Sequence, residues 1–280
     1  MKKVLSVAPS KKHAFDEIFG RKRHILIGVV HLLPLPGSPA YQGGGIKTIL
    51  ERARTDAAGY AEAGFDGLIV ENHGDIPFSK PEDLGPETAT HMAVAAHTLR
   101  VEYGLPLGIN VLANGAIQAL AIASATDAQF IRVNQWANAY VANEGLIEGA
   151  AAKALRYRAL LGEQRIRIFA DAHVKHGAHA IVGDRPLNEL VRDVEFFEAD
   201  AVIATGQRTG HTADPEYIRG IQAATSLPTL VGSGVTTENV NEILSIVDGV
   251  IVASSLKVDG VWWNPVDPVR AKRFVGKVKR

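Results

Sequence analysis

The sequence contains no cysteine and shows no excess of either charge. Without cysteine the chain has no disulfide framework and no thiolate nucleophile, which fits a reducing compartment. Thirty Lys and Arg residues balance thirty Asp and Glu residues, whereas nucleic-acid-binding domains commonly carry a basic excess or a basic stripe. We therefore expect no nucleic-acid partner.

A long uncharged apolar segment is also missing. A helix that spans a bilayer needs about 20 predominantly apolar residues, and the longest candidate, residues 105–125, is interrupted by Pro106, Gly108 and several polar residues. Near the N-terminus, the apolar run of residues 4–8 is too short for a signal peptide before Pro9. These absences predict a cytoplasmic protein without a transmembrane segment, and they leave peripheral association with a membrane open.

Short apolar runs rich in β-branched residues alternate with longer amphipathic segments. Most of the runs are nearly continuous, as expected for parallel strands buried on both faces. The eight predicted strands are residues 25–31, 67–71, 107–112, 130–134, 166–171, 201–204, 229–231 and 249–252. The predicted helices are residues 46–63, 86–103, 116–126, 143–161, 187–198, 215–225, 238–247 and 268–278.

This alternation predicts a single (β/α)₈ barrel, the TIM barrel, of the phosphate-binding type. Such a barrel needs ~250 residues, and the chain has 280. A doubly wound open sheet is the rival fold, but no G-x-G-x-x-G motif follows the first strand. We assign the barrel to residues 25–280. Residues 1–24 form a predicted N-terminal extension whose extra helix, with Phe15 and Phe19 on one face, packs on the exterior or the bottom of the barrel.

Polar residues follow the predicted strands, where active sites of this fold lie. Strand ends are also where polar residues ordinarily begin, but that explains the mixture of histidine, carboxylate, amide and lysine less well. The candidate catalytic residues are His31, Glu71, Asp171, His173 and Lys175. The candidate substrate-binding residues are Asn110, Asn134, Thr205, Gly206 and Arg208, with Arg208 on a loop that could act as a lid.

The last two strands end in small residues that suit an anion. Gly232, Ser233 and Gly234 follow the seventh strand, and Ser254 and Ser255 follow the eighth. Glycine lets the backbone approach an anion closely, and the loops after strands seven and eight form the recurrent phosphate site of this fold. The alternative is that the two loops are simply tight turns capped by serine, with no bound anion. Because both loops carry the signal, we predict a phosphate site.

The segment from Asp171 to His176 holds the densest group of ionisable side chains, and its chemistry stays open. In an extended strand Asp171, His173 and Lys175 would face one way. Lys175 could form a Schiff base or act as an anion clamp, and His173 or His176 could transfer protons near neutral pH. A surface loop of charged residues is an equally weighted alternative.

Two further questions stay open: whether the site holds a metal ion, and what the two asparagines bind. Asp171 with histidines, joined by His31 or Glu71, could hold a divalent metal. No H-E-x-x-H signature is present, so no cofactor and no metal ligand is assigned. Asn110 and Asn134 could bind a sugar hydroxyl or a carbonyl oxygen, or could be core residues bonded to the backbone.

Five segments together resemble the BtpA/SgcQ family: residues 28–39, 71–72, 171–176, 205–210 and 250–260. The resemblance implies a phosphate-binding barrel, and the family is named for a protein linked to photosystem I biogenesis in cyanobacteria. The leading hypothesis is an enzyme that acts on a small phosphorylated metabolite, a sugar phosphate or a nucleotide-derived one, by aldol/lyase or isomerase-type proton transfer. The alternative is a non-catalytic assembly or stability factor that binds a protein or a membrane surface. We also expect a homo-oligomer.

Overall fold

Eight parallel strands close into a barrel in the computed structural model, which describes residues 14–206 and 214–279. Their spatial order is β1-β11-β10-β9-β7-β4-β3-β2, and β1 pairs with both β11 and β2. The closed order confirms the predicted barrel and rejects the open sheet. The strands are β1 Ile25–His31, β2 Gly67–Glu71, β3 Leu107–Asn110, β4 Phe130–Val133, β7 Arg167–Asp171, β9 Ala201–Ala204, β10 Thr229–Val231 and β11 Gly249–Val252.

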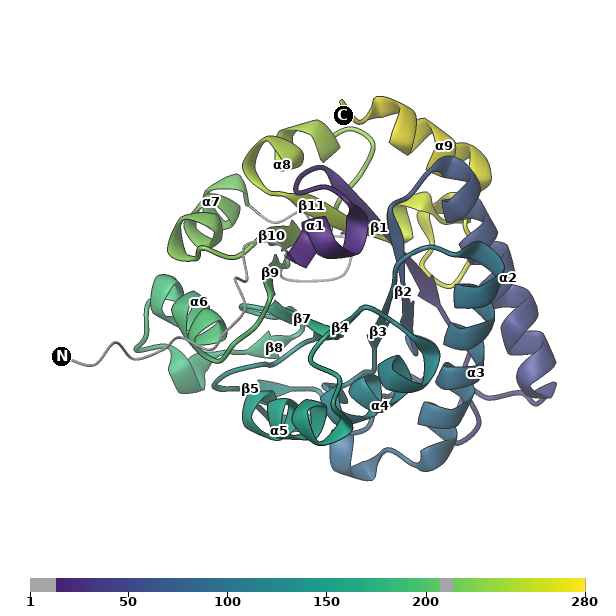
Figure 1. Ribbon diagram of the computed structural model, residues 1–280, viewed down its shortest axis with the longest axis horizontal. Coiled ribbons are helices and arrows are strands. Elements are labelled where there is room, and N and C mark those ends of the chain that lie inside the picture. The colour runs from purple at the N-terminus through teal and green to yellow at the C-terminus, as the bar shows by residue number, and fades with distance from the viewer. Residues whose placement is uncertain (1–13, 207–213, 280) are drawn as a thin grey trace.

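A ring of helices surrounds the strands (Figure 1). The main hydrophobic core lies between this ring and the barrel wall. None of the helices in the described part of the chain is long and apolar enough to cross a membrane. The outer helices are α2 Gly45–Ala63, α3 Pro86–Tyr103, α4 Ala116–Thr126, α5 Ala151–Leu161, α6 Leu187–Phe196, α7 Pro215–Ala224, α8 Val240–Ile246 and α9 Pro268–Lys277.

A short N-terminal helix, α1 (Ala14–Phe19), lies across the amino-terminal opening of the barrel (Figure 1). Phe15 is buried, and its ring lies 5.5 Å from that of Phe169 inside the barrel. Phe169 in turn stacks on Phe130 at 4.4 Å. These aromatic contacts close the bottom of the barrel, which is one of the two positions predicted for the N-terminal extension.

The predicted helix over residues 143–161 is wrong in its first half, because α5 begins only at Ala151. Residues before it form an antiparallel hairpin of β5 (Ala139–Ala142) and β6 (Gly145–Glu148), and β8 (Gly177–Ala178) pairs with β5. Gly145 adopts a φ of 101°, which lies outside the right-handed helical region and suits a hairpin turn. The hairpin adds a small second sheet beside the barrel mouth.

A buried ion pair fixes the segment that follows β11. Lys257 Nζ donates to Asp56 Oδ2 of α2, and both side chains are fully buried. The other carboxylate oxygen of Asp56 accepts a hydrogen bond from the Val266 backbone N–H at 2.7 Å. Burial lowers the pKa of Lys257 despite the attraction of Asp56. The carboxylate therefore pins both ends of the loop that carries Trp262 to the helix ring.

We expect Lys257→Met to lower the free energy of unfolding by about 3–5 kcal/mol, because the buried Asp56 carboxylate then loses its closest cation and keeps the longer contact with Arg52 at 3.4 Å. Lys272→Met is the matched control, since Lys272 is exposed and lies 3.9 Å from Glu62 on the surface; it should cost less than about 1 kcal/mol. Urea denaturation measures both values. Equal losses in the two variants would contradict the structural role of the buried pair.

Candidate functional site

Two adjoining cavities open at the carboxyl ends of the barrel strands. The smaller has a volume of about 80 Å³ and the larger one of about 450 Å³. Four side chains line both cavities, so that the two form one continuous site. They are Glu71, His73, Arg132 and Lys175.

The smaller cavity is a cup formed by the two loops that the sequence singled out. Residues 232–236 and 252–255 line it, and the Ser255 hydroxyl donates to the Val235 carbonyl at 2.7 Å, which ties the loops together. Gly234 has a φ of 67°, a conformation that favours glycine. The predicted phosphate residues thus share one cup, and phosphate binding itself stays a prediction.

Glu71 at the end of β2 is the centre of the polar contacts in this site. Its Oε1 lies 3.0 Å from His73 Nδ1 and 3.7 Å from His31 Nε2. Its Oε2 accepts a hydrogen bond from Asn110 Nδ2 at 2.5 Å, and Arg132 lies 4.0 Å away. Burial works to raise the pKa of Glu71, but the hydrogen bond from His73 and the surrounding positive charge hold it well below the usual range. Glu71 is therefore ionised.

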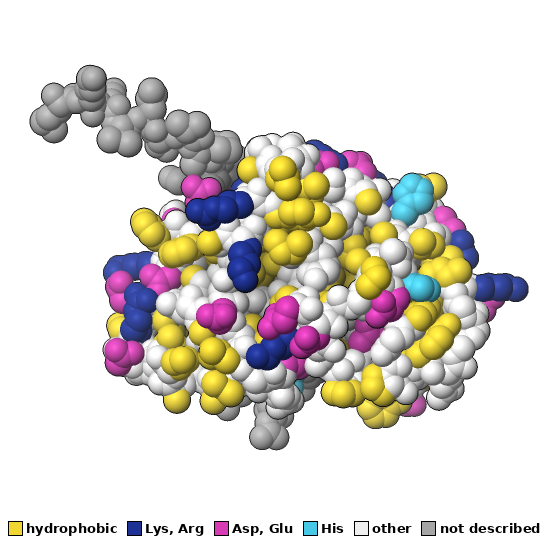
Figure 2. All heavy atoms as spheres, turned by 90° about the horizontal axis from the view of Figure 1, so that it is seen from below, with side chains coloured by type: hydrophobic (Ala, Val, Ile, Leu, Met, Phe, Trp, Pro, Cys, Tyr) yellow, Lys and Arg dark blue, Asp and Glu magenta, His cyan; other side chains and the backbone are white. Residues whose placement is uncertain are grey.

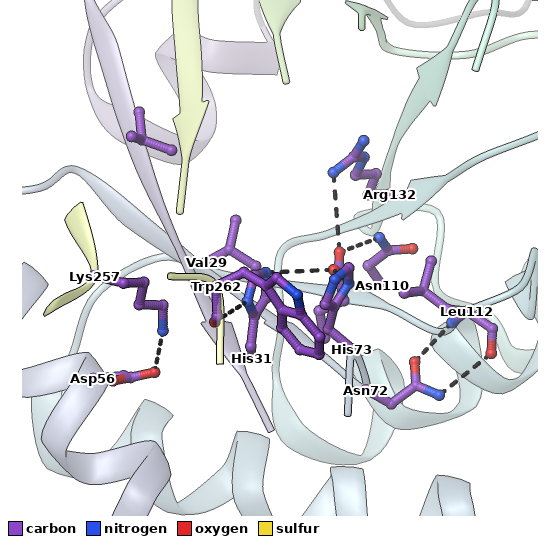
Figure 3. Close-up of polar contacts among 12 residues, drawn as sticks. Val29, His31, Asp56, Asn72, His73, Asn110, Leu112, Arg132, Lys257 and Trp262 are labelled. Atoms are coloured by element: carbon purple, nitrogen blue, oxygen red, sulfur yellow. Dashed lines mark hydrogen bonds and ion pairs between the residues drawn. The ribbon is translucent and has the colours of Figure 1, made fainter. Parts of the chain in front are cut away.

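His31 ends β1 and packs face to face on His73, with ring centroids 4.4 Å apart. Its Nδ1 lies 3.3 Å from the Trp262 carbonyl oxygen, and the Trp262 ring packs edge-on against His73 (Figure 3). Burial, and next the proximity of His73, lower the pKa of His31 well below its ordinary value. The lowered pKa strengthens the preference of His31 for its neutral form.

Asp171 supports the site from behind rather than lining it. Its carboxylate accepts hydrogen bonds from Arg132 Nε and Nη2 at 3.2 and 3.1 Å, and from Asn134 Nδ2 at 3.1 Å. This bidentate pairing fixes the guanidinium plane, so that Arg132 faces Glu71. Asp171 therefore orients two residues of the cavity wall.

Lys175 and His173 do not face the same way. Strand β7 ends at Asp171, and the chain then bends instead of continuing extended, so the expectation of a common face is wrong. Lys175 lines both cavities, and burial together with the charge of Arg132 lowers its pKa to about 8. His173 instead stacks on His179 at 3.7 Å, and burial lowers its pKa to about 4.

The remaining candidates separate into two groups. Asn110 and Asn134 line the larger cavity, and within the described residues their buried Oδ1 atoms have no hydrogen-bond partner. Thr205 is buried and donates to the His173 carbonyl at 3.3 Å, and neither it nor Gly206 is among the described residues that line the two cavities. Arg208 lies outside the described residues.

Two residues of the site were not among the predicted site residues. His73 follows Glu71 by two positions, and Arg132 interrupts an otherwise apolar strand. A cation within a buried strand is itself a signal, because Arg is rarely buried without a partner. His31, Glu71 and His73 also bring three potential metal-ligating atoms within 4.8 Å of one another.

Comparison with known proteins identifies the family of the chain. The sequence profile of the BtpA family matches residues 22–280. The chain belongs to the BtpA family. One relative in this family, an uncharacterized protein of Pyrococcus abyssi, is 43% identical over 91% of this chain and 95% of its own length. The photosystem I biogenesis protein BtpA of Synechocystis is 40% identical over 89% of this chain and 86% of its own length.

Several solved structures of other proteins have a fold similar to that of this BtpA-family chain. A structure of tryptophan synthase from Mycobacterium tuberculosis matches with a TM-score of 0.61 at 16% identity, over 98% of this chain and 99% of that chain. N-(5′-phosphoribosyl)anthranilate isomerase from Pyrococcus furiosus matches with a TM-score of 0.53 at 16% identity, over 91% and 98% of the two chains. At such low identity the likeness establishes the barrel.

The lowered pKa of Lys175 can be tested by its reactivity. We expect acetic anhydride to acylate Lys175 with a pH midpoint near 8, far below the 10.5 of an ordinary lysine, because only the neutral amine is nucleophilic. Peptide mass spectrometry after competitive labelling at pH 6–11 gives the profile, with exposed Lys153 as the internal reference. A midpoint above pH 10 would show that Lys175 is not buried beside Arg132 as described.

Proposed function

We propose that this protein is an enzyme that acts on a small phosphorylated metabolite by proton-transfer chemistry of the lyase/aldolase or isomerase type. One observation carries the proposal: the glycine–serine cup opens directly onto an ionised carboxylate and a lysine of lowered pKa. A scaffold for other proteins does not need such groups in an internal cavity, where burying them without partners costs several kcal/mol. One protein of similar fold, N-(5′-phosphoribosyl)anthranilate isomerase, is named for a phosphorylated substrate.

The larger cavity suits the body of a hydroxylated substrate. With a phosphate in the cup, the rest of the molecule would extend past Glu71 into a space of about 450 Å³. There the Oδ1 atoms of Asn110 and Asn134 are acceptors without a protein donor among the described residues. Buried acceptors are normally satisfied, so hydroxyl groups of a sugar phosphate or of a nucleotide-derived phosphate are the expected donors.

Lys175 is the residue best suited to move a proton. General acid–base catalysis is most effective when the pKa of the group lies near the working pH, and that of Lys175 is about 8. The pKa of Glu71 is too low for an efficient base, and His173 does not line the two cavities. We therefore assign proton transfer to Lys175, with Glu71 as the anion that organises His31 and His73.

The experiment is a turnover screen of phosphorylated sugars and nucleoside phosphates. For a compound that is turned over, Lys175→Ala should lower kcat by about 10²–10⁴-fold, the usual contribution of a general acid or base. Glu71→Gln should also impair turnover, since the neutral amide no longer attracts the surrounding cations. Lys153→Ala, on the exposed face of α5, is the matched control and should leave kcat unchanged.

Borohydride separates two roles of Lys175. If Lys175 forms a Schiff base with a carbonyl substrate, reduction traps a covalent adduct on it, and the Ala variant gives none. If it acts only as a proton donor or clamp, turnover occurs without an adduct. The absence of turnover across the whole screen, with no loss of the cellular role in either variant, would contradict the enzymatic proposal.

A non-catalytic assembly or stability factor is the second candidate function. It is favoured by the name of the Synechocystis relative, a photosystem I biogenesis protein. A large apolar side chain at the end of α6 also supports it, because Phe196 is 81% exposed beside Phe197. On the face shown in Figure 2, basic and acidic side chains alternate among apolar ones, so this face has no continuous surface of one charge.

A further inference from the structure

We propose that His31, Glu71 and His73 bind one divalent transition-metal ion where the two cavities meet. The three side chains come from the ends of β1 and β2, which are neighbours in the barrel with His31 directly opposite Glu71. All three line the smaller cavity, and their potential ligand atoms lie within 4.8 Å of one another. Figure 3 shows the two histidines gathered beside the Trp262 loop.

The distances suit a shared ion. Bonds of about 2.0–2.2 Å to nitrogen and oxygen place neighbouring ligand atoms roughly 3.0–3.4 Å apart in octahedral or tetrahedral geometry. Glu71 Oε1 lies 3.0 Å from His73 Nδ1 and 3.7 Å from His31 Nε2. To close around an ion, these atoms need a small movement of the His31 ring and the displacement of the proton that His73 Nδ1 donates to Glu71.

The tautomer of His31 is fixed by the backbone. A carbonyl oxygen can only accept, so the contact with Trp262 O assigns the proton of the neutral ring to Nδ1. Nε2 then presents a lone pair to Glu71 Oε1, which also carries only lone pairs. Two such atoms face each other favourably when a cation lies between them. A histidine that donates its other N–H to a backbone carbonyl is the usual arrangement behind a metal ligand.

Glu71 is positioned in the same way. Asn110 donates to its Oε2, which fixes the carboxylate and directs Oε1 toward the two histidines. The two histidine rings stack with their centroids 4.4 Å apart. Two protonated rings would repel each other at this distance, whereas two neutral rings that bind one ion would not. The ligand set thus has one negative charge against the two positive charges of the metal.

The chemistry of the ligands selects the metal class. Imidazole favours zinc, copper, iron or nickel over magnesium, calcium and manganese, which prefer oxygen. Three protein ligands leave coordination positions open, and these would face the cavity lined by Lys175 and the cup. Metal binding by itself does not depend on the proposed function. A role of the metal in polarising a substrate oxygen does rest on the proposed function.

Metal titration of the full chain tests the site without a substrate. Chelator-treated protein should bind Co²⁺ in a 1:1 ratio with visible d–d absorption, and Zn²⁺ should displace it in calorimetry. His73→Ala and Glu71→Gln should each weaken Co²⁺ binding by at least about 100-fold, because losing a direct ligand costs more than losing an outer partner. His97→Ala, which removes an exposed histidine of α3, should leave the affinity unchanged.

Circular dichroism checks that the variants fold. If the Glu71→Gln variant does not fold, His73→Ala carries the test alone, since His73 lies beyond the end of β2. No stoichiometric binding to the wild-type chain, or equal binding by wild type and His73→Ala, would overturn the metal site. Metal binding without turnover in the substrate screen would refute the proposed function alone.

Discussion

A single buried carboxylate determines how the mouth of this barrel is arranged. Glu71 stays ionised although its side chain is buried, so its charge has to be compensated by its neighbours. Asn110, Arg132 and His73 surround it, and each comes from a different strand or loop. Removing this charge would leave Arg132 without the attraction of Glu71 and the two histidines without the carboxylate that they share.

The closed parallel barrel makes this arrangement possible. Residues far apart in the sequence meet because every strand ends at the same rim. Glu71 and Asn110 are paired directly across β2 and β3, and the Asp171 carboxylate bonds Arg132 across β7 and β4. The helix α1 closes the opposite end with aromatic side chains, so the interior is apolar below and polar above. The polar side chains thereby gather at one end of the barrel.

The sequence predicted most of the fold because a parallel barrel has a strong one-dimensional pattern. Most barrel strands are nearly continuous apolar runs, and the helices between them are long enough for their periodicity to be recognised. The hairpin of residues 139–148 was missed because short antiparallel strands with partial exposure resemble the start of an amphipathic helix. The positive φ of Gly145 and the pairing of β5 with β8 distinguish the hairpin from a helix, and neither can be read from the sequence.

The sequence predicted where the site lies better than it predicted which side chains contact one another there. Placing the glycine–serine loops in one cup needed only the rule that strands seven and eight are neighbours. The pairing of His31 with His73, and of Arg132 with Asp171, depends on side-chain directions that no spacing reveals. The orientation of His173 was wrong for the same reason, since a bend after Asp171 is not encoded in a simple pattern.

The central claim is that this BtpA-family barrel holds a phosphate group in the cup beside Glu71 and Lys175. A crystal structure of the protein soaked in inorganic phosphate, with sulfate excluded, tests it most directly. The account predicts density for the anion against the backbone nitrogens of Gly234 and of Ser254 or Ser255, and its loss in Gly234→Asp crystals, where a carboxylate occupies the cup. An anion bound only elsewhere, with the cup holding water at saturating phosphate, would contradict the account.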